Sequence, residues 1–198
     1  MKRLFLSLLT LTACGALTAA EIGKPAPDFT ATDINGKTIK LSDYKGKIVV
    51  LESYNLDCPF CANHFKSGAA QELQGKLTAK GVVWLLVNSV NANHASHRSA
   101  ADAKKEWKEQ NILATAWLDD SDGKIGHLYG MKTTPHMFVI NKDGVLVYDG
   151  AIDDQPTPKH DARAARNYVK EAVNNLIEGK SVATASTKPY GCGVKYAD

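Results

Sequence analysis

The chain has 198 residues, of which 44% are apolar and 23% are charged, and its formal net charge is +3. This length suits one domain, and the composition is that of a globular protein without low-complexity runs. No block of basic residues has the pattern that follows a phosphate backbone, so we expect no nucleic-acid partner.

The first twenty residues have the order of features that is typical of a secretory signal peptide. Lys2 and Arg3 precede an apolar run at 4–11, and small residues follow as far as Ala20. The run is too short for a permanent transmembrane helix. We therefore predict a signal peptide over 1–20 and an exported, periplasmic or extracytoplasmic protein. Its net charge after cleavage would be +1, from 22 basic and 21 acidic residues.

A second interpretation of this segment involves Cys14. The sequence Leu-Thr-Ala-Cys at 11–14 resembles a bacterial lipobox, in which Cys14 would be lipidated and become the new N-terminus. Only thirteen residues precede Cys14, which is short for that role, so release after Ala20 is the favoured interpretation. We expect a membrane contact only if Cys14 carries a lipid.

Hydrophobic periodicity and turn residues divide 21–180 into alternating strands and helices. We expect strands at 28–32, 38–41, 47–54, 82–90, 114–118, 136–140 and 145–148. We expect helices at 59–80, 100–110 and 123–129, and a last helix from about 161 to 177. The first two strands form a hairpin, and the alternation that follows implies parallel pairs with right-handed crossovers.

Cys58 and Cys61 form the sequence Cys-Pro-Phe-Cys directly after a predicted buried strand. Pro59 suits the first turn of a helix, so the Cys58 sulfur would face the helix N-terminus, where the dipole and free amides stabilise a thiolate. The two intervening residues, Pro59 and Phe60, are candidates for substrate contact and hold the second sulfur within disulfide reach. We predict a redox-active pair. A zinc half-site and two inert core thiols are the alternatives.

These features resemble the thioredoxin superfamily, and more narrowly its exported redoxin branch, which is related to alkyl hydroperoxide reductase and thiol-specific antioxidant. The resemblance covers 22–180 and includes Gly-Lys-Pro-Ala-Pro-Asp-Phe at 23–29, the strand into Cys58, and Thr134-Pro135. It implies an α/β thioredoxin-like fold, in which helices flank a central mixed β-sheet that has an N-terminal β-hairpin. We expect no cofactor.

The resemblance also implies roles for individual residues. Cys58 matches the nucleophile, and Cys61 matches the buried resolving cysteine. Pro135 matches a proline that follows a cis peptide bond and faces the disulfide. Thr134 would then offer its backbone to an extended substrate, as in strand addition.

Glu52 lies six residues before Cys58, inside the predicted Val-Leu strand. Thioredoxin has a buried acid at this position, which relays a proton to the second cysteine. Burial would raise the pKa of the Glu52 carboxyl into the range that a general acid or base needs near neutral pH. The alternative is an acid on an outward-facing edge.

Two departures from the family pattern affect the expected reactivity. Asp57 stands where thioredoxin has Trp, and an adjacent carboxylate disfavours a thiolate. The peroxiredoxin signature Pro-X-X-X-Thr-X-X-Cys is absent, because Leu51 and Asn55 occupy its Pro and Thr positions. Arg98 and Arg163 are the candidates for the arginine that a peroxidatic site would require.

Cys192 lies in a tail over 181–198 that we expect to be loop-like, and it is the third cysteine left after loss of the signal peptide. The ending Lys-Pro-Tyr-Gly-Cys resembles that of a thioredoxin-like subgroup whose active-site stretch reads Asp-Cys-Pro-Phe. This suggests that Cys192 resolves Cys58 or acts as a relay thiol; a free or structural cysteine is the alternative. The six histidines are dispersed, and His94 and His97 are expected to be solvated, so we predict no metal site.

The leading functional hypothesis is a thiol–disulfide oxidoreductase that acts on protein disulfide and dithiol partners outside the cytoplasm. One alternative is a peroxiredoxin-like thiol peroxidase, in which peroxide oxidises Cys58 to a sulfenic acid. The other is a Cu(I) carrier that uses Cys58 and Cys61 as soft ligands.

Overall fold

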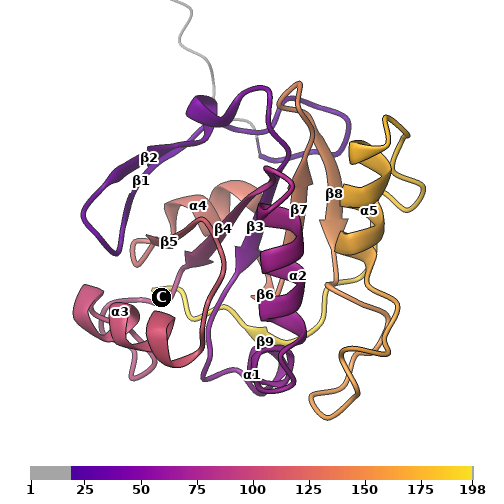
Figure 1. Cartoon of the computed structure of the whole chain (residues 1–198). Helices are drawn as coiled ribbons and strands as arrows, with labels where there is room; N and C mark the ends of the chain where they lie inside the picture. Colours follow the sequence, from indigo (N-terminus) through magenta and orange to yellow (C-terminus); the bar gives the residue numbers. More distant parts are fainter. Residues whose placement is uncertain (1–18, 198) are drawn as a thin grey trace, which may run out of the picture.

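Seven strands form one mixed β-sheet in the order β2-β1-β5-β4-β3-β7-β8 (Figure 1). The computed structural model describes residues 19–197, so the predicted signal peptide up to residue 18 and its Cys14 lie outside the described residues. The strands of this sheet are β1 (Thr30–Asp33), β2 (Thr38–Lys40), β3 (Val49–Ser53), β4 (Val83–Asn88), β5 (Ala116–Asp119), β7 (Met137–Ile140) and β8 (Leu146–Gly150). Two further strands, β6 (Thr133–Thr134) and β9 (Cys192–Gly193), form a small antiparallel sheet.

The helices are α1 (Pro59–Lys66), α2 (Ala69–Thr78), α3 (Ala100–Glu109), α4 (Lys124–Tyr129) and α5 (Tyr168–Ile177), with a 3-10 turn η1 (Leu41–Tyr44). Strands β3, β4 and β5 run parallel, whereas β1, β2, β7 and β8 pair with antiparallel neighbours. The predicted mixed sheet with flanking helices and an N-terminal hairpin is confirmed. No helix among the described residues is long and apolar enough to cross a membrane.

The core lies on both faces of the sheet because the apolar side chains of its central strands alternate between them. Val50 and Leu86 point into a cluster with α1, α2, α3 and α5, whereas Leu51 and Leu85 point into a cluster with α4 and the N-terminal segment. All four side chains are fully buried. Figure 1 shows α2 and α5 in front of the sheet and α4 behind it. A strand buried on both faces needs the continuous apolar run that β3 has.

The sequence-based strand boundaries agree with the structure within two residues, but two predicted helices differ. The helix expected over 59–80 is divided into α1 and α2, because Gly68 has a φ of +77° and interrupts the helical backbone. The last helix begins at Tyr168 rather than near 161. Its start is fixed by Asn167, whose side chain accepts a hydrogen bond from the backbone N–H of Lys170 at 2.8 Å.

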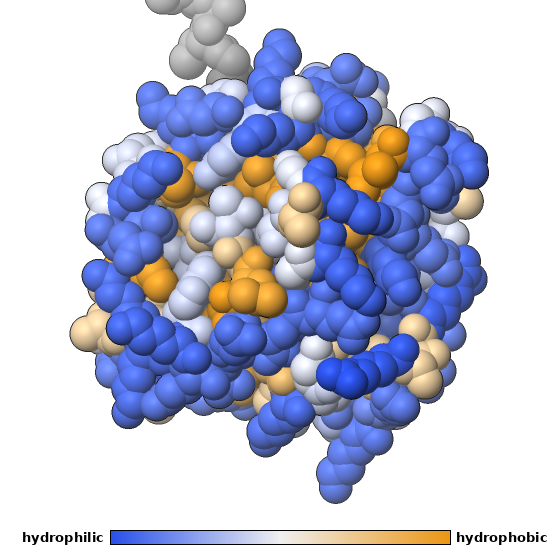
Figure 2. All heavy atoms as spheres, viewed as in Figure 1, coloured by the Kyte–Doolittle hydropathy of each residue, from blue (hydrophilic) through white to orange (hydrophobic). Residues whose placement is uncertain are grey.

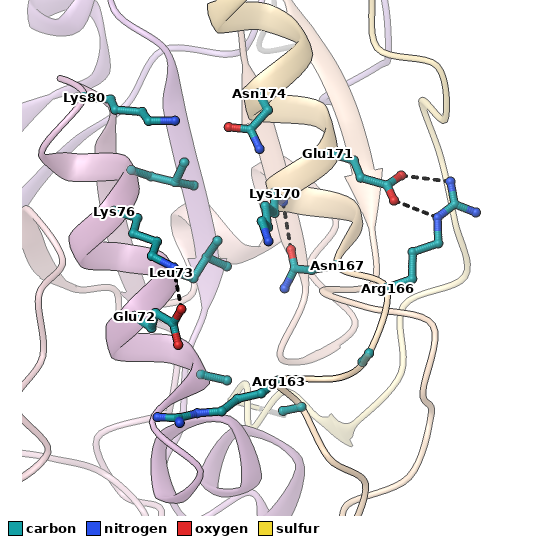
Figure 3. Close-up of a pocket in the computed structure, with 14 residues that line it drawn as sticks. Glu72, Leu73, Lys76, Lys80, Arg163, Arg166, Asn167, Lys170, Glu171 and Asn174 are labelled. Carbon is teal, nitrogen blue, oxygen red and sulfur yellow. Dashed lines mark hydrogen bonds and ion pairs between the residues drawn. The ribbon is translucent and has the colours of Figure 1, made fainter.

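The face viewed in Figure 1 is mostly hydrophilic, with small apolar patches between charged side chains (Figure 2). A groove of about 420 Å³ separates α2 from α5 (Figure 3). Lys76 pairs with Glu72 inside it, and Arg166 pairs with Glu171 at its rim. The lining has five basic side chains and two acidic ones, so these two ion pairs leave it with an excess of positive charge. None of its lining residues is a cysteine or belongs to the Thr134-Pro135 turn.

Candidate active site

Cys58 directly precedes α1, and residues 54–57 connect it to the end of the central strand β3. It occupies the N-cap position with extended backbone angles (φ −77°, ψ 121°), and Pro59 begins the helix. Both Cys58 and Cys61 are buried. The sulfur of Cys58 therefore lies at the N-terminus of α1, where the helix dipole and free amides favour a negative charge.

The Thr134–Pro135 peptide bond is cis, as the resemblance implied. The carbonyl oxygen of Thr134 lies 2.9 Å from the Cys58 sulfur. Thr134 is buried, while Pro59 is exposed and Phe60 is partly exposed beside the cysteines. Their roles in substrate binding remain predictions.

The C-terminal tail reaches the same sulfur, although we expected it to be loop-like. Strand β9 pairs with β6 so that Cys192 lies opposite Thr134, and the Cys192 backbone N–H donates to the Cys58 sulfur at 3.4 Å. Gly191 has a φ of +140°, and a Cβ atom there would lie 2.1 Å from the Thr134 carbonyl oxygen. Only glycine allows so close an approach. The edge at Thr134 that we predicted to bind substrate is therefore covered by the tail.

The three thiols have different acidities. A hydrogen bond from the Cys61 thiol, helped by one from Cys192, holds the pKa of Cys58 below its ordinary value, although burial opposes this. Burial raises the pKa of Cys61 and of Cys192, and so does the hydrogen bond that each of these thiols donates to Cys58. The Thr134 carbonyl can only accept, so it favours the protonated form of Cys58, but the several donors outweigh it. Cys58 is the thiol that ionises first.

Asp57 does not oppose this thiolate as directly as the sequence suggested. Arg98 pairs with Asp57 at 2.5 Å and with Glu106 at 2.9 Å, and Tyr54 donates its hydroxyl to Glu106 at 2.7 Å. The guanidinium, which Glu106 shares, offsets part of the negative charge of the carboxylate next to Cys58. Because two acids hold Arg98, and Arg163 lines the α2–α5 groove, neither hypothesis of a peroxidatic arginine gains support.

Glu52 is buried on the face of β3 that packs against α1, α2, α3 and α5, so the alternative of an outward-facing acid is wrong. The indole N–H of Trp84 donates to its carboxylate at 2.8 Å. Burial nevertheless raises the pKa of Glu52 to about 7. The carboxylate in turn contributes to the raised pKa of Cys61, so the two groups interact.

Sequence reasoning missed Tyr190, which joins the tail to the site. Its ring packs on Phe60 with the centroids 5.7 Å apart, and its hydroxyl donates to Asp153. The motif Lys-Pro-Tyr-Gly-Cys carried a signal for the cysteine but none for this contact. His64 and His136 were also missed as buried histidines, since only their neighbours in space bury them.

A mixed sheet whose central strand delivers a thiol pair to the start of a helix is the architecture of the thioredoxin-fold oxidoreductases, and this protein is one of them. More narrowly, it belongs to the AhpC/TSA family, whose model matches residues 22–149.

Two similar proteins whose names state a thiol–disulfide activity support this class, and a third, of unstated activity, shares the fold. A thiol-disulfide oxidoreductase ResA of Bacillus thuringiensis subsp. konkukian is 30% identical over 160 residues, which cover 75% of this chain and 87% of that protein. The structure of an uncharacterized conserved protein from Geobacillus kaustophilus is 26% identical, with a TM-score of 0.76 over 89% of this chain and 93% of the other. A putative thiol:disulfide interchange protein DsbE from Chlorobium tepidum is 26% identical in sequence. Its structure matches with a TM-score of 0.56 over 81% of this chain and 98% of the other. The prediction of an oxidoreductase is confirmed.

We expect Arg98→Ala to raise the pKa of Cys58 by about one unit, because the Asp57 carboxylate would lose its counter-charge and disfavour the neighbouring thiolate. The pH dependence of Cys58 alkylation by iodoacetamide, followed by mass spectrometry, measures this. Arg166→Ala is the matched control, since it breaks an exposed pair with Glu171. If Cys58 is alkylated with the same pH midpoint in both variants as in the parent protein, Asp57 has no influence on the thiolate.

Proposed function

We propose that the protein exchanges thiols and disulfides with protein partners outside the cytoplasm, with Cys58 as nucleophile and Cys61 as resolving thiol. The observation that carries this proposal is the hydrogen bonding of Cys58 at the start of α1. These bonds lower the pKa of Cys58, and the thiol of Cys61 is their main donor. The relatives named thiol-disulfide oxidoreductase and thiol:disulfide interchange protein support the same chemistry.

The reaction proceeds in two displacements. The Cys58 thiolate attacks one sulfur of the substrate disulfide, which forms a mixed disulfide and releases the other sulfur as a thiolate that takes up a proton. Cys61 then loses its proton and attacks the Cys58 sulfur, which releases the second substrate thiol. Two electrons pass from the cysteine pair to the substrate. The same steps in reverse oxidise a partner dithiol.

Glu52 is the proposed acceptor for the proton that Cys61 loses. Burial alone would keep Cys61 protonated, because it raises the pKa of this thiol. A carboxyl with a pKa of about 7 can take up a proton and release it again near neutral pH. The charge of this carboxyl acts on the pKa of Cys61, so the two groups are close enough to interact.

The tail has the position that an extended substrate would need in strand addition. It pairs with Thr134 and places Cys192 beside the Cys58 sulfur. We infer that β9 must leave before a protein disulfide binds. Cys192 then returns to Cys58 when no substrate is present.

The export part of the proposal depends on the signal-peptide pattern of 1–20. An oxidising compartment is where protein disulfides persist and where an enzyme that exchanges them finds substrates. Lipidation at Cys14 remains the alternative to release after Ala20.

We expect Cys58→Ser to abolish the reduction of insulin disulfides, because no thiolate is left to attack. Cys61→Ser should accumulate mixed disulfides with substrate, visible on non-reducing gels. Cys192→Ser is the matched control and should retain turnover, since Cys58 and Cys61 are intact. Insulin reduction by Cys58→Ser at the parent rate would refute the proposed chemistry.

We expect Glu52→Gln to slow the second displacement by about tenfold to a hundredfold, because the proton of Cys61 loses its acceptor. In the parent protein this step should speed up as the pH rises through about 7, where Glu52 becomes ionised and able to accept a proton. Stopped-flow release of the mixed disulfide across pH measures it. Glu109→Gln, at an exposed acid of α3, should behave like the parent. A pH profile that Glu52→Gln leaves unchanged would remove Glu52 from the mechanism.

We expect Gly191→Ala to speed the reaction of Cys58 with insulin several-fold, because its Cβ atom would collide with the Thr134 carbonyl and detach β9. Gly193→Ala is the control, since a Cβ atom there meets nothing within 4 Å. Stopped-flow measurement of mixed-disulfide formation compares the two variants with the parent. A slower reaction in Gly191→Ala would mean that the tail assists substrate binding instead of blocking it.

A further inference from the structure

Two histidines and an aspartate from separate segments converge beside α1. His64 lies on α1 one turn after Cys61, Asp153 follows β8, and His160 lies in the segment between β8 and α5. One possible ligand atom from each residue lies within 4.8 Å of the other two. Their side chains are 4%, 0% and 6% exposed. We propose that these three residues bind a divalent transition-metal ion such as Zn²⁺.

The ring of His64 supplies the first argument. Its Nε2 atom is buried without a hydrogen-bond partner and lies 3.7 Å from Oδ2 of Asp153. A buried polar atom without a partner costs free energy. A metal ion between this nitrogen and the carboxylate would satisfy both atoms.

The hydrogen bonding of His160 supplies the second argument. Its Nδ1 lies 2.6 Å from the carbonyl oxygen of Thr157, and because a carbonyl only accepts, Nδ1 carries the proton. In the neutral ring Nε2 then has a lone pair, yet it faces Oδ2 of Asp153 at 2.9 Å. Two acceptors in contact need a cation between them, which is either a second proton on His160 or a metal ion.

The carboxylate of Asp153 is oriented for such a role. Its Oδ1 accepts hydrogen bonds from the hydroxyl of Tyr190 and, at 2.9 Å, from the backbone N–H of Gln155. These bonds leave Oδ2 directed at both histidines. Outer hydrogen bonds of this kind, like that of His160 to Thr157, hold metal ligands in place in known metal sites.

The spacing and the donor atoms suit a divalent transition-metal ion such as zinc. Two ligands on a tetrahedral Zn²⁺ with bonds of about 2.0–2.2 Å lie about 3.3–3.6 Å apart. The distances from Asp153 to the two histidines, 2.9 and 3.7 Å, lie on either side of this range. Two imidazoles and one carboxylate suit a borderline ion, whereas Cu(I) prefers sulfur and Mg²⁺ or Ca²⁺ prefers oxygen.

An ion at this place would connect parts of the protein that surround the cysteine pair. His64 anchors it to the helix that carries Cys61. Through Asp153 it reaches Tyr190, which packs on Phe60 and precedes Cys192 in the tail. Bound metal would therefore hold the tail and the segment between β8 and α5 against α1.

The test is Zn²⁺ binding by the untagged chain with all four cysteines changed to Ser, so that no thiol can bind the ion. Equilibrium dialysis should give one Zn²⁺ per chain, and His160→Gln or Asp153→Asn should weaken binding by at least about a hundredfold. Tyr190→Phe should weaken it about tenfold to a hundredfold through the lost hydrogen bond to Asp153. His94→Gln, at an exposed histidine, is the matched control and should bind like the parent.

A second measurement covers the case in which the cysteine-free chain fails to fold. This measurement uses the protein with its cysteines unchanged, oxidised so that a disulfide joins Cys58 and Cys61. Zn²⁺ should raise the unfolding temperature of this protein, and His160→Gln should remove the increase. Zn²⁺ binding that His160→Gln and Asp153→Asn leave intact would overturn the proposal. Absence of binding would also overturn it and would assign the contact to a doubly protonated His160 paired with Asp153.

Discussion

The sulfur of Cys58 requires hydrogen-bond donors around a developing negative charge, and Cys61 on α1 and Cys192 on β9 supply them. Strand β3 is buried on both faces and ends just before Cys58, and α1 begins there with free amides. The Thr134-Pro135 turn closes one side, and β9 brings the Cys192 N–H to the other. The strand, the helix and the turn are fixed by their own packing, so these surroundings of the sulfur are organised before any substrate arrives.

The charges near the cysteine pair are arranged so that little negative charge lies close to the Cys58 thiolate. The Asp57 carboxylate pairs with Arg98, and burial raises the pKa of Glu52 to about 7, so that only part of the Glu52 population is charged at neutral pH. Stabilising the Cys58 thiolate also stabilises the reduced form of the pair, because the disulfide carries no charge that could benefit. The same hydrogen bonds therefore make the oxidised pair a stronger electron acceptor.

The sequence predicted the features that depend on local pattern, which include the buried strand before Cys58, the helix start at Pro59 and the position of the Thr134-Pro135 turn. It did not predict the break at Gly68, because apolar residues continue at a four-residue spacing across it and only the positive φ reveals the interruption. The contacts of Tyr190 and of His64 with Asp153 join positions far apart in the chain. No local spacing encodes such contacts, so the structure was needed to find them.

The pairing of β6 with β9 also fixes the length of the tail. Thr187 is held on one side by the backbone N–H of Ala151, at 2.9 Å, and Tyr196 is held on the other by the carbonyl of Met131, at 2.8 Å. Between these two anchors the register of a strand turns successive side chains to opposite faces. Adding or removing one residue within β9 would turn the Cys192 thiol to the opposite face of this strand. The evolution of this segment is thus restricted in residue number as well as in residue type.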